Sequence, residues 1–423
     1  MSAKENAQEI LRRLTSASAA ERILISFAAL IMAVIVGAVI VLISGRVATC
    51  QTAATTILGV GFCYDPIQVY LVLFNGALGE PFLVNSPGLI KPLNPNWNPL
   101  NFGLALTLKE TTLLIFTGLS VAVAFRAGLF NIGTQGQLIL GALATALFAY
   151  FVAPILPGGV LGGLILIPLA IFVGALVGGL YGAIPGALKA YADANEVITT
   201  IMLNFIAAQV AFVLVSEFFR NPDSQVVETT PLPDFATLLP VAFPQGGDFS
   251  ILALLFGLAL VVVVWYLLEQ TSFGYDLRTS GEQPEAAEYG GVDAKRTTVM
   301  SMFLSGALGG IGGAIWVLMV MGKFQAGVPS LGFDGITVTI LAGNNPFGII
   351  PASLLFGTLK SGSLAVQFQT GVPKQLVGVL RGLIILFVAM PEFFRMLGSY
   401  VNLEPDTDAV ATDGGSLLGG DDE

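Results

Sequence analysis

Long apolar runs, separated by short polar connections, cover most of the chain. Many of these runs reach the roughly 20 residues that a helix needs to cross the hydrocarbon core of a membrane. Membrane spans are therefore expected at about residues 23–44, 105–125, 132–152, 160–183, 196–216, 249–268, 298–321, 333–342, 347–366 and 376–394. The pattern predicts an all-α, polytopic membrane protein with about ten transmembrane helices. It lacks the alternating segments, each of about ten residues, that are typical of a transmembrane β-barrel.

Two of the predicted spans are interrupted or shortened. Residues 333–342 are too few to cross straight, which indicates a broken or re-entrant helix. The glycine-rich residues 133–141 follow a polar turn that contains asparagine, and residues 348–357 follow the sequence Asn-Asn-Pro. Interrupted segments at corresponding places predict two related halves of five helices each, arranged around a central path.

The polar segments divide the chain. We expect an N-terminal segment (1–22), a membrane domain (23–398) and a disordered acidic tail (399–423). Within the membrane domain lie an outer insertion (45–103), an outer loop (217–248) and an inner loop (270–297). With the N-terminus inside, the inner segments hold about twice as many lysines and arginines as the outer ones. The positive-inside rule therefore predicts that both termini are cytoplasmic.

Composition narrows the chemistry. The chain contains no histidine and only two cysteines, which excludes most zinc, haem and iron–sulfur sites, so no metal is expected. Cys50 and Cys63 both lie in the outer insertion, where they either form a disulfide or remain two thiols. The net charge is −10, and such an excess of acidic residues keeps proteins soluble at high salt, which indicates a halophilic source.

Two short helices are predicted outside the spans. Asp65 and Pro66 are typical of a helix start in the outer insertion, while residues 87–99 read as loop. In the inner loop, Pro284 and Glu285 favour a helix start and Gly291 a helix end. The inner helix would have about two turns and a length of roughly 10 Å. Composition alone favours an ordinary loop helix.

The motif of this inner helix resembles a known one. Glu285, Ala286 and Ala287, followed after three residues by Gly291, are similar to the Glu-Ala-Ala…Gly loop of ATP-binding-cassette (ABC) importer permeases. In that family the loop is the coupling helix that docks on the ATPase subunit. FRAGLFNIGTQGQ at 125–137 resembles the signature of permeases for ribose, branched-chain amino acids and nucleosides. Three further segments agree with this signature: NEVITTIMLN at 195–204, GFDGI at 332–336 and NNPFG at 344–348. The branch that the chain most resembles is that of nucleoside or simple-sugar permeases. Together with the acidic composition, this resemblance indicates an importer of a halophilic archaeon.

The resemblance implies a set of partners. Two permease chains, identical or homologous, would form a translocation path at their interface within the membrane lipid. Two ABC ATPase subunits would bind inside and hydrolyse ATP with Mg²⁺, while this chain binds no cofactor and is not an enzyme. An extracellular substrate-binding lipoprotein would deliver a small polar solute, and alternating access would carry it inward. A nucleoside or simple sugar is expected, with branched-chain amino acids as the alternative and no role for nucleic acid.

Polar residues near the predicted span ends are the candidates for lining the path. They are Asn131, Gln135, Glu196, Asn204, Asp334 and Asn344. Glu196 and Asn204 are eight residues apart and so share a helix face. Each candidate has a structural alternative as a helix cap, a turn residue or an interhelical hydrogen-bonding group.

Two other classes of function were weighed. A secondary transporter would also be a bundle with broken helices, but it needs a mid-span ion site, whereas the carboxylates here cluster at span ends. An intramembrane enzyme would need a nucleophile–base pair, and the sequence offers none within a span. The chain also lacks the glycine-rich phosphate loop of an ATPase.

Overall fold

The computed structural model describes residues 19–389, except for 51, 58, 82, 85–89, 92–93, 96, 239, 242 and 244–246. The expected acidic tail (399–423) and most of the N-terminal segment (1–22) lie outside the described residues, and the domain boundaries remain predictions. The chain divides into two units, one made of Met1–Gly37 with Leu383–Glu423 and the other of Ala38–Gly382. Every site considered below lies in the second unit.

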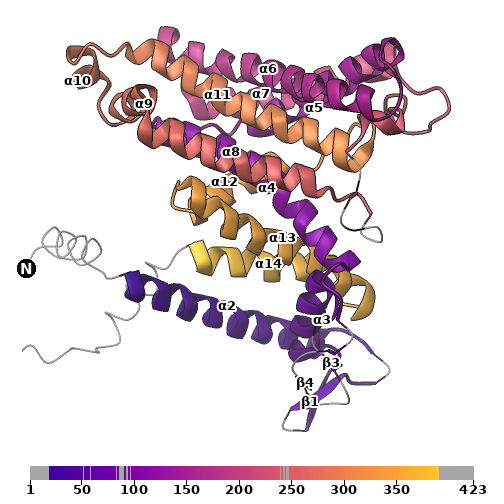
Figure 1. The fold of residues 1–423 in the computed structure, drawn as a ribbon. Coiled ribbons are helices and arrows are strands. Elements are labelled where there is room, and N and C mark those ends of the chain that lie inside the picture. The colour runs from indigo at the N-terminus through magenta and orange to yellow at the C-terminus, as the bar shows by residue number, and fades with distance from the viewer. Residues whose placement is uncertain are drawn as a thin grey trace, which may run out of the picture. The chain divides into compact units, whose positions relative to one another are not determined.

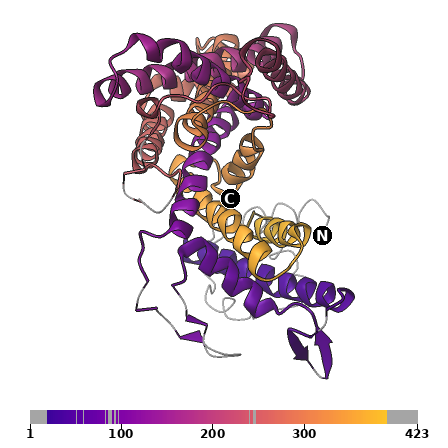
Figure 2. The same cartoon turned by 90° about the vertical axis from the view of Figure 1, so that its right-hand side faces the viewer.

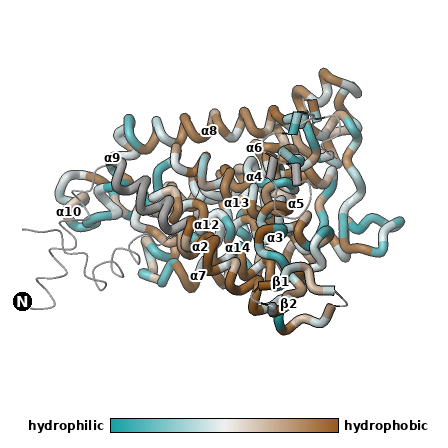
Figure 3. Tube along the Cα trace, turned by 90° about the horizontal axis from the view of Figure 1, so that it is seen from below, coloured by the Kyte–Doolittle hydropathy of each residue, from teal (hydrophilic) through white to brown (hydrophobic). Residues whose placement is uncertain are grey.

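The described chain is mainly helical, as expected (Figure 1). The longer helices are α2 (Ala19–Val47), α3 (Pro66–Leu78), α4 (Phe102–Arg126), α5 (Thr134–Val152), α6 (Val160–Ala192), α7 (Glu196–Leu214), α8 (Ile251–Gln270), α9 (Ser272–Glu282), α11 (Ala294–Ile315), α12 (Leu331–Leu341), α13 (Pro346–Gln369) and α14 (Lys374–Ala389). Short elements are α10 (Pro284–Tyr289), two 3-10 turns, η1 (Ala153–Ile155) and η3 (Asp234–Ala236), and two π-turns, η2 (Val215–Phe219) and η4 (Trp316–Met321). Figure 3 shows the hydrophobic character of α8 and the more hydrophilic α9.

Seven helices within the described residues are long and apolar enough to cross a membrane. They comprise α4, α5 with η1, α6, α7 with η2, α8, α11 with η4, and α13. Shorter apolar helices lie at Ile31–Val47, Leu331–Leu341 and Gln375–Phe387, where three further spans were expected. The multi-span helical fold is therefore confirmed, whereas the number of ten spans and the relation between two halves remain predictions.

Small residues bring the central helices into close contact. A Cβ added at Gly178 of α6 would lie 2.5 Å from the carbonyl oxygen of Gly306 in α11. One added at Gly141 of α5 would lie 2.5 Å from the Cα of Gly310, also in α11. Helix association in a membrane depends on such close packing because lipid tails are as apolar as the side chains. The glycines of α5, α6 and α11 thus assemble the bundle that positions the site.

The outer insertion is more ordered than the sequence indicates. Its helix α3 begins as predicted, with Asp65 Oδ1 accepting a hydrogen bond from the backbone N–H of Ile67 at 2.9 Å. Cys50 and Cys63 form a disulfide with their Cα atoms 5.8 Å apart. Two small hairpins were missed, β1 (Thr55–Ile57) with β2 (Val60–Phe62) and β3 (Leu83–Val84) with β4 (Ile90–Lys91) (Figure 2). Strands of two or three residues are too short to produce a visible alternation in the sequence.

Two segments return into the bundle as non-helical chain. After Arg126 the chain turns back, and α5 begins where Thr134 Oγ1 lies 3.1 Å from Ser120 Oγ of α4. Ser120 precedes Arg126 by six residues, so α5 starts about 9 Å inside the end of α4. Residues 322–330 likewise precede α12, whose Gly335 packs against Thr117 in α4. The first re-entry agrees with the interruption expected before residue 133, and the second leads into the short helix expected at 333–342, although residues 322–330 were not themselves expected to re-enter.

Candidate functional site

Asn131 connects the first re-entrant segment, the non-helical residues 127–133, to the bundle through hydrogen bonds. Its side chain is fully buried, and its Oδ1 accepts a hydrogen bond from the backbone N–H of Gly133 at 2.9 Å. Its Nδ2 donates to Ser305 Oγ at 2.7 Å and to Gln137 Oε1 at 3.0 Å. These bonds join residues 125–142 to α11. Non-helical backbone inside a membrane requires such partners, because unpaired polar groups are costly there.

Gln135 and Asn204 act in the same way. Gln135 Nε2 donates to the carbonyl oxygen of Pro329 at 2.9 Å, and its Oε1 accepts from the N–H of Gly332 at 2.8 Å. Asn204 Nδ2 donates to the carbonyl oxygen of Ile132 at 2.9 Å, and its Oδ1 accepts from the N–H of Gly136 at 2.7 Å. Gln135 thus joins one re-entrant segment to the other, and Asn204 joins the first of them to α7.

Glu196 lies apart from these amides. It begins α7, where the side chain of the preceding Asn195 caps the helix, and its Oε2 lies 3.4 Å from Lys189 Nζ at the end of α6. Asn204 shares its helix but lies eight residues on, about 12 Å along the axis. The two predicted path residues of α7 therefore belong to different environments.

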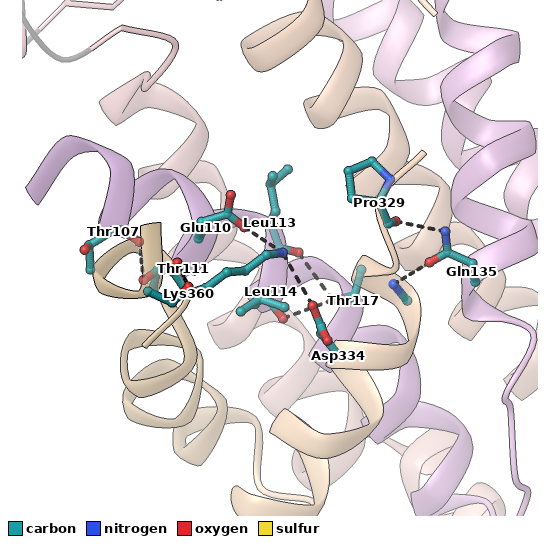
Figure 4. A network of polar contacts seen from close by, with 12 residues as sticks. Thr107, Glu110, Thr111, Leu113, Leu114, Thr117, Gln135, Pro329, Asp334 and Lys360 are labelled. Carbon is teal, nitrogen blue, oxygen red and sulfur yellow. Dashed lines mark hydrogen bonds and ion pairs between the residues drawn. The ribbon is translucent and has the colours of Figure 1, made fainter. Parts of the chain in front are cut away.

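A cluster of three charged residues joins three helices beside the second re-entrant segment (Figure 4). Lys360 Nζ of α13 lies 2.9 Å from Glu110 Oε2 of α4 and 3.4 Å from Asp334 Oδ2 of α12. The three side chains are between 17% and 27% exposed. Asp334 is one of the predicted path residues, whereas Glu110 was not predicted. Glu110 could have been recognised as a candidate because it is a carboxylate within an otherwise apolar helix, eight residues from the start of α4.

A cavity of about 350 Å³ adjoins this cluster. Its polar lining comes from Lys109, Glu110, Gln325 and Lys360, and its apolar lining includes Leu113, Trp316, Val320 and Met321. Residues 325–331 close another side, and Ala326 and Gly327 also line a second cavity of about 440 Å³ that reaches α5 and α7. The re-entrant residues 322–330 therefore have a cavity on either side.

A second charged cluster lies where α4 and α8 end. Glu269 of α8 bridges two arginines, its Oε1 lying 3.1 Å from Arg126 Nη1 and its Oε2 2.6 Å from Arg278 Nη1 of α9. Arg126 Nε also donates to the carbonyl oxygen of Asn344 at 3.1 Å. Asn344 has a φ of +58° in the turn between α12 and α13. This predicted path residue thus lies in a turn that Arg126 holds.

The inner loop forms two helices. The predicted one is present as α10 (Pro284–Tyr289), with Gly291 at a φ of +86° beyond its end. Glu285 and Ala286 are exposed, whereas Ala287 is buried. The sequence analysis missed α9, whose glycines and polar residues obscure its amphipathic pattern.

Residues 103–389 match the family model described as "Branched-chain amino acid transport system / permease component". A guanosine ABC transporter permease protein of Bacillus subtilis (strain 168) is 33% identical over 383 residues, covering 89% of this chain and 95% of that protein. A nucleoside ABC transporter permease protein of Lactococcus lactis is 32% identical over 342 residues, covering 79% and 86% respectively. A glucose ABC transporter permease protein of Haloferax volcanii is 32% identical over 302 residues, covering 70% and 78%.

Proposed function

The chain belongs to the family of permease components of branched-chain amino acid transport systems, and we propose that, like the similar proteins named above, it imports a nucleoside or a simple sugar. The chain is an ABC transporter permease, a multi-pass protein of the plasma membrane that works with ATPase and substrate-binding subunits and is not itself an enzyme. Family membership favours this function over a secondary transporter. The similar proteins are named for guanosine, nucleosides and glucose, which supports a polar solute over a branched-chain amino acid.

The single observation that supports the proposed site of energy input is the exposed helix α10. Tyr289 at its end is 95% exposed, and Glu285 and Ala286 are exposed beside it. A large aromatic ring and a small alanine on one short helix suit a groove on a protein partner. We assign this helix as the coupling helix, with Glu285, Ala286 and Gly291 facing or bounding the contact with the ATPase and Ala287 packed inward. The proposed cytoplasmic location of both termini puts α10 on the ATPase side.

The two charged clusters suggest how movement of α10 would reach the path. Helix α9 leads directly into α10, and its Arg278 is joined through Glu269 to Arg126. Arg126 in turn holds the turn at Asn344, from which α12 and α13 diverge. Since Asp334 and Lys360 lie on these two helices, a displacement of α9 would be transmitted to the residues around the cavity.

The transporter would contain two permease chains, either two copies of this one or a pair of homologues. In that arrangement Asn131, Gln135 and Asn204 shape the path by holding its non-helical walls, and Asp334 lies beside it. Glu196 would act at the mouth of α7. The outer insertion, with its disulfide, would face the extracellular binding protein.

The proposed coupling helix can be tested by Ala286→Arg. The larger, charged side chain should block docking, so that ATPase subunits no longer co-purify with the permease and guanosine uptake falls at least tenfold. Ala54→Arg makes the same change at an exposed alanine of the outer insertion, remote in the sequence from α10, and should leave the co-purification of ATPase subunits unchanged. Full ATPase recovery together with normal uptake in Ala286→Arg would refute the assignment.

A further inference from the structure

We propose that the cavity beside Glu110 and Lys360 is a solute subsite within the permease, built for a neutral, polyhydroxylated solute such as a nucleoside. The inference rests on the proposed function, and it adds the place and the residues by which this chain itself recognises the solute. The cavity lies at the second re-entrant segment, between α4, α13 and η4. Its volume of about 350 Å³ falls within the range of small-molecule sites, roughly 300–1,000 Å³.

The polar side of the cavity suits hydroxyl groups. Glu110 supplies carboxylate oxygens, which only accept hydrogen bonds, and Lys360 supplies an ammonium group, which only donates. The two groups are 2.9 Å apart, so they offer an acceptor and a donor to neighbouring atoms of one ligand. Adjacent hydroxyls of a ribose or a hexose can each donate and accept, and so can bridge such a pair. Gln325 adds an amide to the lining.

The rest of the lining is largely apolar and includes an aromatic ring. Trp316, Met321, Val320 and Leu113 belong to this part, and Trp316 is otherwise buried. Indole and thioether groups make favourable contacts with planar rings and with the carbon faces of sugars. A lining with both charged and apolar side chains matches a solute that has both hydroxyls and a flat or hydrophobic face.

The charge balance indicates that the solute is not an anion. Two carboxylates, Glu110 and Asp334, surround the single ammonium of Lys360. Lys109, the other cation in the lining, lies 3.7 Å from the carboxylate of Asp248. With Asp334 and Asp248, which lie outside the lining but pair with its two lysines, the group holds three carboxylates and two ammonium groups, and neither lysine is left to pair with a phosphate or a carboxylate of the solute. A nucleoside should therefore be accepted and the corresponding nucleotide rejected.

The competing explanation is that Glu110, Lys360 and Asp334 only hold three helices together. Ionisable groups in spans either pair with one another or mark a substrate pathway, and the two roles can coincide. Gln325 separates the two explanations. It lines the cavity from a non-helical segment and belongs to neither ion pair, so a solute that fills the cavity would shield position 325.

The test uses a unique thiol. Both cysteines of the chain form the disulfide, so Gln325→Cys introduces the single free thiol of this chain, and labelling is read on this subunit of the assembled transporter. Labelling by a small thiol reagent is measured with and without guanosine, glucose and guanosine monophosphate. Guanosine is expected to slow labelling at least fivefold and guanosine monophosphate to have no effect. Protection by glucose instead of guanosine would identify the solute as a sugar, which the same subsite accommodates. Glu217→Cys, at an exposed position of η2, should be labelled equally in every case.

Transport kinetics provide the second measurement. Glu110→Gln keeps the shape of the side chain but removes the charged acceptor, and should raise the KM for uptake about tenfold or more. Glu217→Gln is the matched control and should behave like the wild type. If uptake is normal but no transported probe protects position 325, the subsite is refuted and the proposed function stands. If the wild-type transporter takes up neither guanosine nor glucose, the proposed function fails. Should Glu110→Gln not assemble, the labelling of Gln325→Cys decides alone.

Discussion

Gly128 and Gly281 lie backbone against backbone, one just after α4 and the other near the end of α9. A Cβ added at Gly128 would lie 2.6 Å from the carbonyl oxygen of Gly281, and one added at Gly281 would lie 2.5 Å from the carbonyl carbon of Ala127. Backbone cannot yield as a flexible side chain can. The two glycines therefore fix the position of α9, and with it the start of α10, against the beginning of the first re-entrant segment.

Replacing Gly281 by alanine should separate these two elements. Overpacking of a close contact typically costs about 1–3 kcal/mol, and here the displaced element is the lead to the coupling helix. We expect Gly281→Ala to keep its ATPase subunits while uptake per ATP hydrolysed falls several-fold, as measured in proteoliposomes. Gly378→Ala is the control, because an added Cβ in α14 meets nothing within 4 Å. Unaltered coupling in Gly281→Ala would contradict this role.

Glu269 joins the same elements through charge. Removing its charge by Glu269→Gln leaves Arg126 and Arg278 close together without their shared carboxylate, which destabilises their arrangement. The expected result is a loss of uptake with ATP hydrolysis retained, measured as the ratio of the two rates. Glu282→Gln, an exposed carboxylate of α9, provides the comparison and should leave the ratio unchanged. Equal ratios in the two variants would show that Glu269 is not part of the coupling route.

The sequence predicted the helical membrane fold because long apolar runs have few other stable arrangements. It also located the first re-entrant segment and the short helix α12, since glycine and asparagine interrupt residues 125–142 and 333–342 is too short. It could not predict that Asn131, Gln135 and Asn204 are engaged in hydrogen bonds at both ends of their amides. Their partners, such as Ser305 and Pro329, are distant in the chain. For the same reason the pairing of Glu110 with Lys360, 250 residues apart, needed the structure.

These buried amides give a prediction about stability. Asn131→Leu has nearly the same size but cannot satisfy the N–H of Gly133 or the side-chain amide of Gln137. Each buried polar group left unpaired costs about 1–3 kcal/mol, so the melting temperature in detergent should fall by several degrees. Asn98→Leu removes a side chain from an exposed turn instead and should have a much smaller effect. Similar melting temperatures for the two variants would exclude a fastening role for Asn131.

The start of the second re-entrant segment, at Lys323, should respond to acid. Glu228 is buried and lies 2.9 Å from Lys323 Nζ, and this hydrogen bond lowers the pKa of the Glu228 carboxyl. A lowered folded-state pKa stabilises the protein above the unfolded value of about 4.3, and that stabilisation is lost as the pH falls through the folded-state pKa. Glu228→Gln should therefore lower the melting temperature at neutral pH and show a smaller further decrease on acidification than the wild type. Parallel curves of melting temperature against pH for the two proteins would refute this assignment.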